Sequence, residues 1–480
     1  MLKKYYYLVA FCSLSLAAKA QTTWNLERCV KYAVDNNLQL KQSALQVGNA
    51  VLQSAQAKSQ QLPTLNGSFQ PSINLGRSVD PTSNTFANQT IFSNGYGLNA
   101  AYNAYAGGTI KNGIKQAQLD IEASQADAAN VLNNMALSIA QAYLSVVLSE
   151  ENLLAGQENL AQTKRQLAQI QKFINAGSLP FGSRLDLEAI EAANEQTIVQ
   201  FENNVGIAYL NLKTLMNFPP NDELKVERPE VSLPVDNLAS LSATSVYEKA
   251  INTQPQIQAA DLRRKSAEVT VVIAKGRGLP SVQAFGALRS NYSSLGKKLA
   301  GIEQGTAQYF GDLYVPASGG NPESYVPLLV RQPKAVLANT PYFEQLGDNL
   351  STTIGLSISV PIYQAGQVGI AVERAKLQVK AAELQEEQTK RQLNNDITLA
   401  IANAKAAQKI LQASQKSLKA RELALSNTEK RFAAGAANSF ELSTAQSALD
   451  NIKLSLIINK YDYLFKLKVV DFYQGIPIKL

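Results

Sequence analysis

The sequence predicts an α+β membrane protein in which a β-barrel continues into a barrel of long α-helices. Three observations predict this fold class: an export segment at the N-terminus, a repeat within the chain, and very long helical segments that alternate with short strands. The expected assembly is a trimer with a 12-stranded barrel, to which each protomer gives four strands.

The first twenty residues have the features of a secretory signal peptide. A positive start at Lys3 and Lys4 leads into an uncharged, mostly apolar stretch that ends at the small-x-small cleavage site Ala18-Lys19-Ala20. We therefore expect a signal peptide over residues 1–20. The alternatives are a membrane anchor, for which the stretch is short compared with about 20 residues, and a lipoprotein signal at Cys12, where Phe11 occupies the position of a small residue.

Composition excludes several function classes. Charged residues make up 17% of the 480 residues, where about 25% is typical of soluble proteins. The signal peptide holds three lysines and no acid, so its removal lowers the net charge from +7 to +4, which does not indicate nucleic acid as a partner. Cys29 is then the only cysteine, so an intrachain disulfide is impossible.

The residue types that most enzymes need are missing. The chain has no histidine, no cysteine cluster and no phosphate-binding glycine loop, which removes the commonest general base and the usual zinc ligands. We expect no enzyme activity, no catalytic residue, no cofactor and no metal site. No run of 18 apolar residues follows the signal peptide, so we expect no transmembrane helix, and membrane entry requires a closed barrel.

An internal repeat organises the chain. Residues 30–40 align with residues 247–257 at an offset of 217, and farther along Gly177 aligns with Gly435 at an offset of 258. The second copy therefore holds 41 more residues. The expected organisation is a first repeat over 21–217, an inter-repeat linker at the equator over 218–243, and a second repeat over 244–480 with a larger extracellular loop at about 291–349.

Both copies have the same predicted order of helix, strand, strand, very long helix, turn and helix. Residues 370–434 contain neither glycine nor proline, and a helix of that length would span about 98 Å. Its counterpart covers 110–176. The other helices are about half as long, so two of them end to end match one long helix and give four helical columns; they are expected over 26–61, 185–217, 246–275 and 440–474.

Four segments show the alternation of a strand, and two of them separate cleanly into an apolar and a small polar face, as a strand of a lipid-facing barrel must over about 9–11 residues. A half-buried sheet of a soluble protein has the same pattern. Because small barrels need about eight strands, four cannot close alone, whereas three copies give twelve. The expected strands are 65–75, 96–104, 282–288 and 352–362.

The ordered set of these features resembles the TolC-like outer-membrane efflux proteins over nearly the whole mature chain. The motifs that carry the resemblance are Leu-Pro pairs at 62–63 and 279–280, the segment 355–363 followed by Gly366, and the turn 431–435 followed by Phe440-Glu441-Leu442. The resemblance implies a homotrimeric, passive conduit. Its barrel would contact outer-membrane lipid in a Gram-negative bacterium, and its stem in the periplasm would meet an adaptor (membrane fusion protein) and an inner-membrane pump.

The resemblance also points to gate residues at the stem tip. Asp186 and Glu441 occupy the positions of carboxylates at the periplasmic entrance, and Phe432 replaces an aromatic that is usually Tyr. The structural alternative is that both carboxylates cap helix N-termini, and both roles can hold together. The remaining candidates are Arg184 in the first turn, Thr444 where some members have Asp, and Gly177 with Gly435 as tip turns and adaptor contacts.

The main rival is a periplasmic coiled-coil adaptor or structural protein of an export complex. Such a protein shares export and long helical hairpins, but it should have one hairpin rather than two. The segment at 291–349 is open between a decorated loop and a ligand-binding or capping role. The exported substrate, small molecule or polypeptide, does not follow from the sequence.

Overall fold

The computed structural model describes residues 23–79, 84–88, 90–178, 180–228, 241–316 and 325–476. The expected signal peptide and residues 229–240 of the expected linker lie outside the described part. The chain forms two units. The first, mainly helical, holds residues 1–54, 115–269 and 374–480, and the second, which contains the strands, holds residues 55–114 and 270–373.

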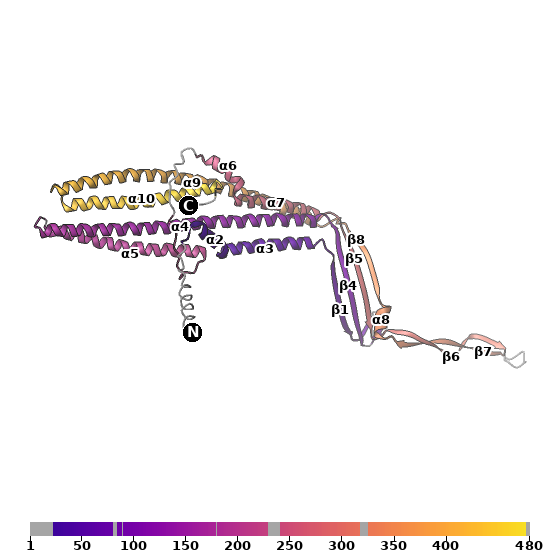
Figure 1. The fold of residues 1–480 in the computed structure, drawn as a ribbon. Helices are drawn as coiled ribbons and strands as arrows, with labels where there is room; N and C mark the ends of the chain where they lie inside the picture. Colours follow the sequence, from indigo (N-terminus) through magenta and orange to yellow (C-terminus); the bar gives the residue numbers. More distant parts are fainter. Residues whose placement is uncertain are drawn as a thin grey trace, which may run out of the picture. The chain divides into compact units, whose positions relative to one another are not determined.

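The helices occur as two matched sets (Figure 1). Corresponding helices of the two sets have 11, 22, 67 and 35 residues. The two long helices are confirmed, with each end within three residues of its expected place. The first set is α2 (Leu26–Asn36), α3 (Leu38–Ser59), α4 (Thr109–Asn175) and α5 (Gly182–Met216), and the second is α6 (Ala243–Thr253), α7 (Pro255–Gly276), α9 (Gln367–Ala433) and α10 (Ser439–Tyr473).

The expectation of one helix over 26–61 and one over 246–275 is wrong, because each segment is two helices. Between α6 and α7 the break falls at Pro255, which has no N–H to continue a helix. Between α2 and α3 it falls at Asn37, whose Oδ1 accepts hydrogen bonds from the backbone N–H of Gln39 (2.8 Å) and Leu40 (3.2 Å). Asn37 thus caps the start of α3.

Two buried cores occupy equivalent positions in the two halves. At the offset of 217 residues, Ala33 and Leu40 of the first core correspond to Ala250 and Ile257 of the second. At the offset of 258 residues, Ile139 corresponds to Ile397. The first core also holds Cys29, and burial raises the pKa of its thiol to about 12. Repeated burial at the same offsets shows that the duplication extends to side-chain packing.

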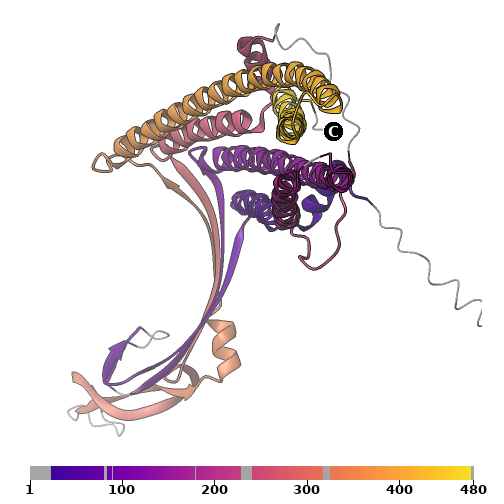
Figure 2. The same ribbon diagram turned by 90° about the vertical axis from the view of Figure 1, so that its left-hand side faces the viewer.

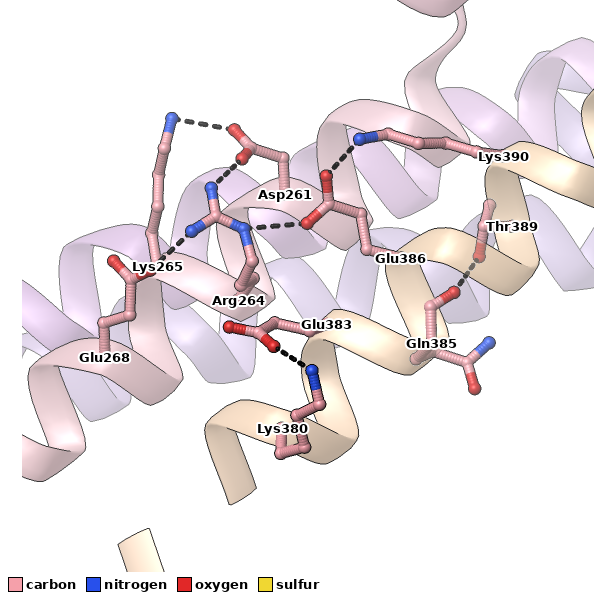
Figure 3. Close-up of polar contacts among 10 residues, drawn as sticks. All are labelled: Asp261, Arg264, Lys265, Glu268, Lys380, Glu383, Gln385, Glu386, Thr389 and Lys390. Atoms are coloured by element: carbon pink, nitrogen blue, oxygen red, sulfur yellow. Dashed lines mark hydrogen bonds and ion pairs between the residues drawn. The ribbon is translucent and has the colours of Figure 1, made fainter. Parts of the chain in front are cut away.

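Ion pairs join α7 to both long helices, and Figure 3 shows those between α7 and α9. Arg264 in α7 donates from Nε to the buried Glu386 of α9 at 2.7 Å and from Nη2 to Asp261 at 2.6 Å. On its other side α7 contacts α4, where Arg263 pairs with Asp127. At the equivalent places of the first half stand Val and Ala (positions 47 and 128), so this network belongs to one repeat only.

Four strands form one antiparallel sheet in the order β1-β4-β5-β8. Figure 2 shows them as a twisted, curved ribbon. The outer strands β1 and β8 each have one edge without a partner in the described chain. The four expected strands are confirmed as β1 (Thr64–Asn74), β4 (Ile91–Ala106), β5 (Ser281–Ser293) and β8 (Ser351–Ser359).

The sheet has one apolar and one polar face, and the register keeps each face continuous across the strands. On the apolar face Phe69 is opposite Tyr96, with ring centroids 4.9 Å apart, and Leu98 is opposite Leu288. Ile354 on the same face is 85% exposed. The polar face holds mainly Ser, Asn, Gln, Thr, Gly and Ala, including Asn66, Ser68, Asn99, Gln283, Thr353 and Ser357.

The segment between β5 and β8 is more structured than a decorated loop. It forms a hairpin of β6 (Lys297–Pro316) and β7 (Tyr325–Asn339), followed by α8 (Tyr342–Asp348). Buried Gln345 joins α8 to the end of β5, because its side chain accepts from Ser293 N–H and donates to Ser293 O, both at 3.0 Å. A smaller hairpin, β2 (Arg77–Val79) and β3 (Phe86–Asn88), lies between β1 and β4.

One described helix, α4, is long and apolar enough to cross a membrane by length and composition, whereas the sequence led us to expect none. Its apolar part includes Ile139, Tyr143 and Val147, which are buried in the first core. The Tyr143 hydroxyl donates to the carbonyl of Glu227 at 2.6 Å. These contacts explain the apolar stretch by core packing.

Candidate functional site: the tips of the two helical hairpins

Both long helices end in the same local structure. Gly177 and Gly435 have φ of +73° and +72°, the left-handed conformation that glycine adopts most easily. After α4, Gly177 N–H donates to Ile174 O (2.9 Å) and Ser178 N–H to Phe173 O (2.9 Å). This pair of bonds is the Schellman motif that terminates helices, and the turn after α9 repeats it at Gly435 and Ala436.

The two return helices begin differently. Asn438 caps α10 by accepting a hydrogen bond from the Glu441 backbone N–H at 2.8 Å. By contrast, α5 begins at Gly182 without a side-chain cap, so Asp186 is its fifth residue and lies beyond the first turn. The turn before α5 is also shorter than expected, because α5 begins at Gly182, three residues before its expected start. Glu441 lies in the first turn of α10, as the capping alternative requires, whereas Asp186 lies outside the first turn of α5.

The tip residues separate into two groups, one on each side of the paired hairpins. Asp186 and Thr444 line one groove of about 480 Å³ together with the exposed Phe440. Within the described residues Asp186 has neither a hydrogen bond nor an ion pair, so its carboxylate is available to a partner outside this protomer. The structure brings Asp186 and Thr444 together, as a shared entrance requires.

The second groove lies between α4 and the turn after α9. It measures about 1090 Å³ and is lined by Phe173 and Ile170 from one hairpin and by Phe432, Gly435 and Leu442 from the other. Polar residues, among them Arg165, Gln169 and Glu429, complete its wall. Phe432 and Gly435 therefore belong to a different surface from Asp186.

Glu441 and Arg184 have partners within the protomer. Arg431 Nη2 lies 3.3 Å from Glu441 Oε2 and 3.0 Å from the carbonyl of Ala436. This ion pair spans the turn after α9. Arg184 donates to Glu188 at 2.7 Å and to Gln171 of α4 at 2.8 Å. Arg431 and Arg184 therefore each join the two helices of their own hairpin.

Sequence patterns did not identify several exposed apolar residues at the tips as candidate contacts. Phe440, Phe181 and Leu185 are 67%, 60% and 53% exposed at the starts of the return helices. Large apolar side chains at such positions indicate a surface that another molecule covers. The pattern that could have identified them is an apolar residue shortly after the tip glycine in both repeats.

The fold and these tips were compared with known proteins. A sequence profile described as outer membrane efflux protein matches residues 30–217 and 246–468, which include both helical hairpins and all four strands of the main sheet. The chain belongs to the outer membrane efflux protein family. Proteins of this family are channels and not enzymes, as the sequence predicts. Within the described residues no cluster of potential ligands could hold a metal ion.

Solved structures of outer membrane efflux proteins have the same fold. VceC of Vibrio cholerae covers 95% of this chain and 97% of its own, with a TM-score of 0.73 and 16% identity. CusC covers 96% of both chains, with a TM-score of 0.73 and 16% identity. The match to the CmeC channel of Campylobacter jejuni covers 94% of this chain and 85% of CmeC, with a TM-score of 0.72 and 18% identity. A search of curated protein sequences found no significant match. The family assignment favours a channel over the periplasmic adaptor.

Proposed function

We propose that this outer membrane efflux protein is the channel of a tripartite export system, a homotrimer that conducts solutes passively across the outer membrane and periplasm. An inner-membrane pump would supply the energy, and a periplasmic adaptor would join pump and channel. The cargo would be small molecules or polypeptides. The observation that carries the proposal is the sheet, whose two edges have no partner in the described chain and whose apolar face has exposed large side chains such as Ile354 and Leu356.

The open edges support closure with other copies. Unpaired backbone groups are costly in lipid, so a membrane-spanning sheet must close on itself. Strands β1 and β8 run in opposite directions, because three antiparallel pairings separate them. The β8 strand of one copy can therefore pair with β1 of the next, and the resulting barrel is antiparallel throughout.

A channel needs an open lumen, and this need favours three copies over two. Two copies give eight strands, and a barrel of about eight strands is just wide enough to be filled by its own side chains. Three copies give twelve strands and leave room for a duct. The strands of 11 and 9 residues at the two edges match the length of about 9–11 residues that spans a bilayer.

The tips support the periplasmic end of the conduit. We place Asp186 and Thr444 at the entrance, where three copies of the unpaired Asp186 repel one another and attract cations. Phe432, Gly177 and Gly435 lie on or beside the larger groove, to which we assign the adaptor. Its aromatic walls and polar rim have the composition of a protein–protein contact.

Conductance across a planar lipid bilayer tests the proposal. We expect the purified protein to conduct ions, and Asp186→Ala with Glu441→Ala to lower its conductance of K⁺, because the variant removes carboxylates that attract cations. Glu429→Ala, a carboxylate of the groove assigned to the adaptor, is the matched control and should leave conductance unchanged. Protein that inserts in the bilayer without conductance in any variant would contradict the channel.

A further inference from the structure

The four strands of the sheet contain a single charged residue, Arg289 in β5. Its side chain is exposed and has neither a hydrogen bond nor an ion pair within the described residues. Charged residues in membrane-spanning segments are rare because their desolvation is costly, and those present tend to face a water-filled cavity. An isolated arginine on this sheet therefore requires a role.

The register places Arg289 on the polar face. It is opposite Gly97 on one side and Ser351 on the other, and Gly97 in turn is opposite Ser68. This row alternates with the apolar positions Leu98 and Leu288, which point to the other face. In a closed barrel with its apolar face toward lipid, Arg289 points into the lumen.

No acid among the described residues pairs with the guanidinium group. The side chains beside it in the row are small, and the next row of the same face holds Asn99, Ala287 and Thr353. Two acids lie in α8, which contacts β5 through a hydrogen bond from the Ser290 hydroxyl to the carbonyl of Leu346. Glu344 pairs with Lys298 at 2.5 Å, and Asp348 forms no ion pair with Arg289.

We propose that three copies of Arg289 form a cationic ring in the barrel lumen, which binds anions and gives this end of the channel a preference for anionic solutes. The inference rests on the trimeric channel proposed above. A guanidinium group presents a planar fork of donors that matches carboxylate and phosphate, so these are the anions the ring would bind best.

The dimensions allow one ring to control the whole lumen. Twelve strands about 4.7 Å apart and tilted by about 40° enclose a radius of about 12 Å before side chains are added. The Debye length is about 10 Å at 0.1 M salt and about 3 Å at 1 M. Three arginines therefore influence the full cross-section at low salt and lose this influence at high salt.

The test is the reversal potential across a planar bilayer in a KCl gradient, which gives the ratio of chloride to potassium permeability. Asp186→Asn with Glu441→Gln forms the background, since it removes the tip carboxylates that favour cations. At about 0.1 M salt, Arg289→Gln should lower the ratio at least about threefold and Arg289→Glu should invert the preference, while both differences vanish at about 1 M.

A second probe and a matched control sharpen the result. Citrate added on the barrel side should block the channel with Arg289, and Arg289→Gln should weaken the block about tenfold or more. Arg331→Gln changes an exposed arginine of β7 that is outside the four-stranded sheet, so it should leave both readings unchanged. An equal shift in Arg331→Gln would overturn the ring.

Failure of the ring differs from failure of the channel. Conductance that persists with the same permeability ratio in Arg289→Gln and Arg289→Glu overturns the ring and leaves the channel. Loss of conductance in every variant, the Arg289 background included, overturns the proposed function and the ring with it.

Discussion

Asn37 and Gln254, which are 217 positions apart in the two repeats, make equivalent hydrogen bonds. Asn37 donates its side-chain amide to the carbonyl of Leu215, near the end of α5, at 2.7 Å, and Gln254 donates to that of Phe472, near the end of α10, at 3.3 Å. Both side chains are buried. In each repeat a broken helix is therefore fastened to the last turn of the return helix, where carbonyl groups lack helical partners.

Substitution of Asn37 separates its two roles. Asn37→Ala removes the cap of α3 and the bond to Leu215, so we expect a loss of about 1–3 kcal/mol in the free energy of unfolding. Asn37→Ser keeps a capping oxygen but removes the amide donor, and it should cost less than Asn37→Ala. Thermal denaturation of the solubilised protein measures both. Asn36→Ala, which changes a neighbouring amide bonded only within its own helix, is the control.

The Arg264 network should depend on its buried carboxylate. Glu386→Gln removes the charge that Arg264 and Lys390 share, and we expect a loss of about 1–3 kcal/mol because hydrogen bonds to charged groups are of that size. Glu387→Gln breaks only an exposed pair with Arg391 and should cost at most about 0.5 kcal/mol. Equal destabilisation by the two variants would show that burial is unimportant here.

Asp450 should make stability depend on pH. Burial raises the pKa of its carboxyl in the folded state, although a hydrogen bond from Gln446 opposes the shift. The folded chain therefore binds this proton more tightly than the unfolded chain, and stability falls as pH rises through the folded-state pKa. Asp450→Asn should raise the melting temperature at pH 7 and leave it unchanged below the ordinary aspartate pKa of about 3.9. A stabilisation that is equal at both pH values would argue against burial as its cause.

The tip turns should need their glycines for conformation and not for space. No atom lies within 4 Å of a Cβ built on Gly177, but its φ of +73° costs a residue with a side chain about 1–2 kcal/mol. Gly177→Ala should destabilise by that amount. Gly113→Ala in α4, where the surroundings are equally open and φ is helical, should stabilise by about 0.5–1 kcal/mol. Hydrogen exchange at the tip would locate the change.

Much of the fold follows from local rules that the sequence displays. The long helices could be predicted because neither contains proline and because a glycine in the left-handed conformation ends each one. The strands could be predicted because all four segments alternate, although only two of them separate cleanly into an apolar and a small polar face. The break at Asn37 could not, since its cause is a side-chain cap combined with a distant carbonyl, that of Leu215.

The site was less predictable than the fold. Resemblance located Asp186 and Glu441 together, but their surroundings differ because Arg431 pairs with Glu441 across a turn whose geometry only the structure shows. Arg289 lies one residue beyond the expected strand 282–288, so the sequence did not single it out. Its significance required the register, which places it on the polar face beside Gly97 and Ser351.

The most direct test of the trimeric channel is electron microscopy of the detergent-extracted protein, after fractionation to identify the membrane from which it came. A trimeric channel should appear as a threefold particle from the outer membrane, with a short barrel joined to a long helical stem. A soluble, non-tubular particle, or a particle without threefold symmetry, would contradict it.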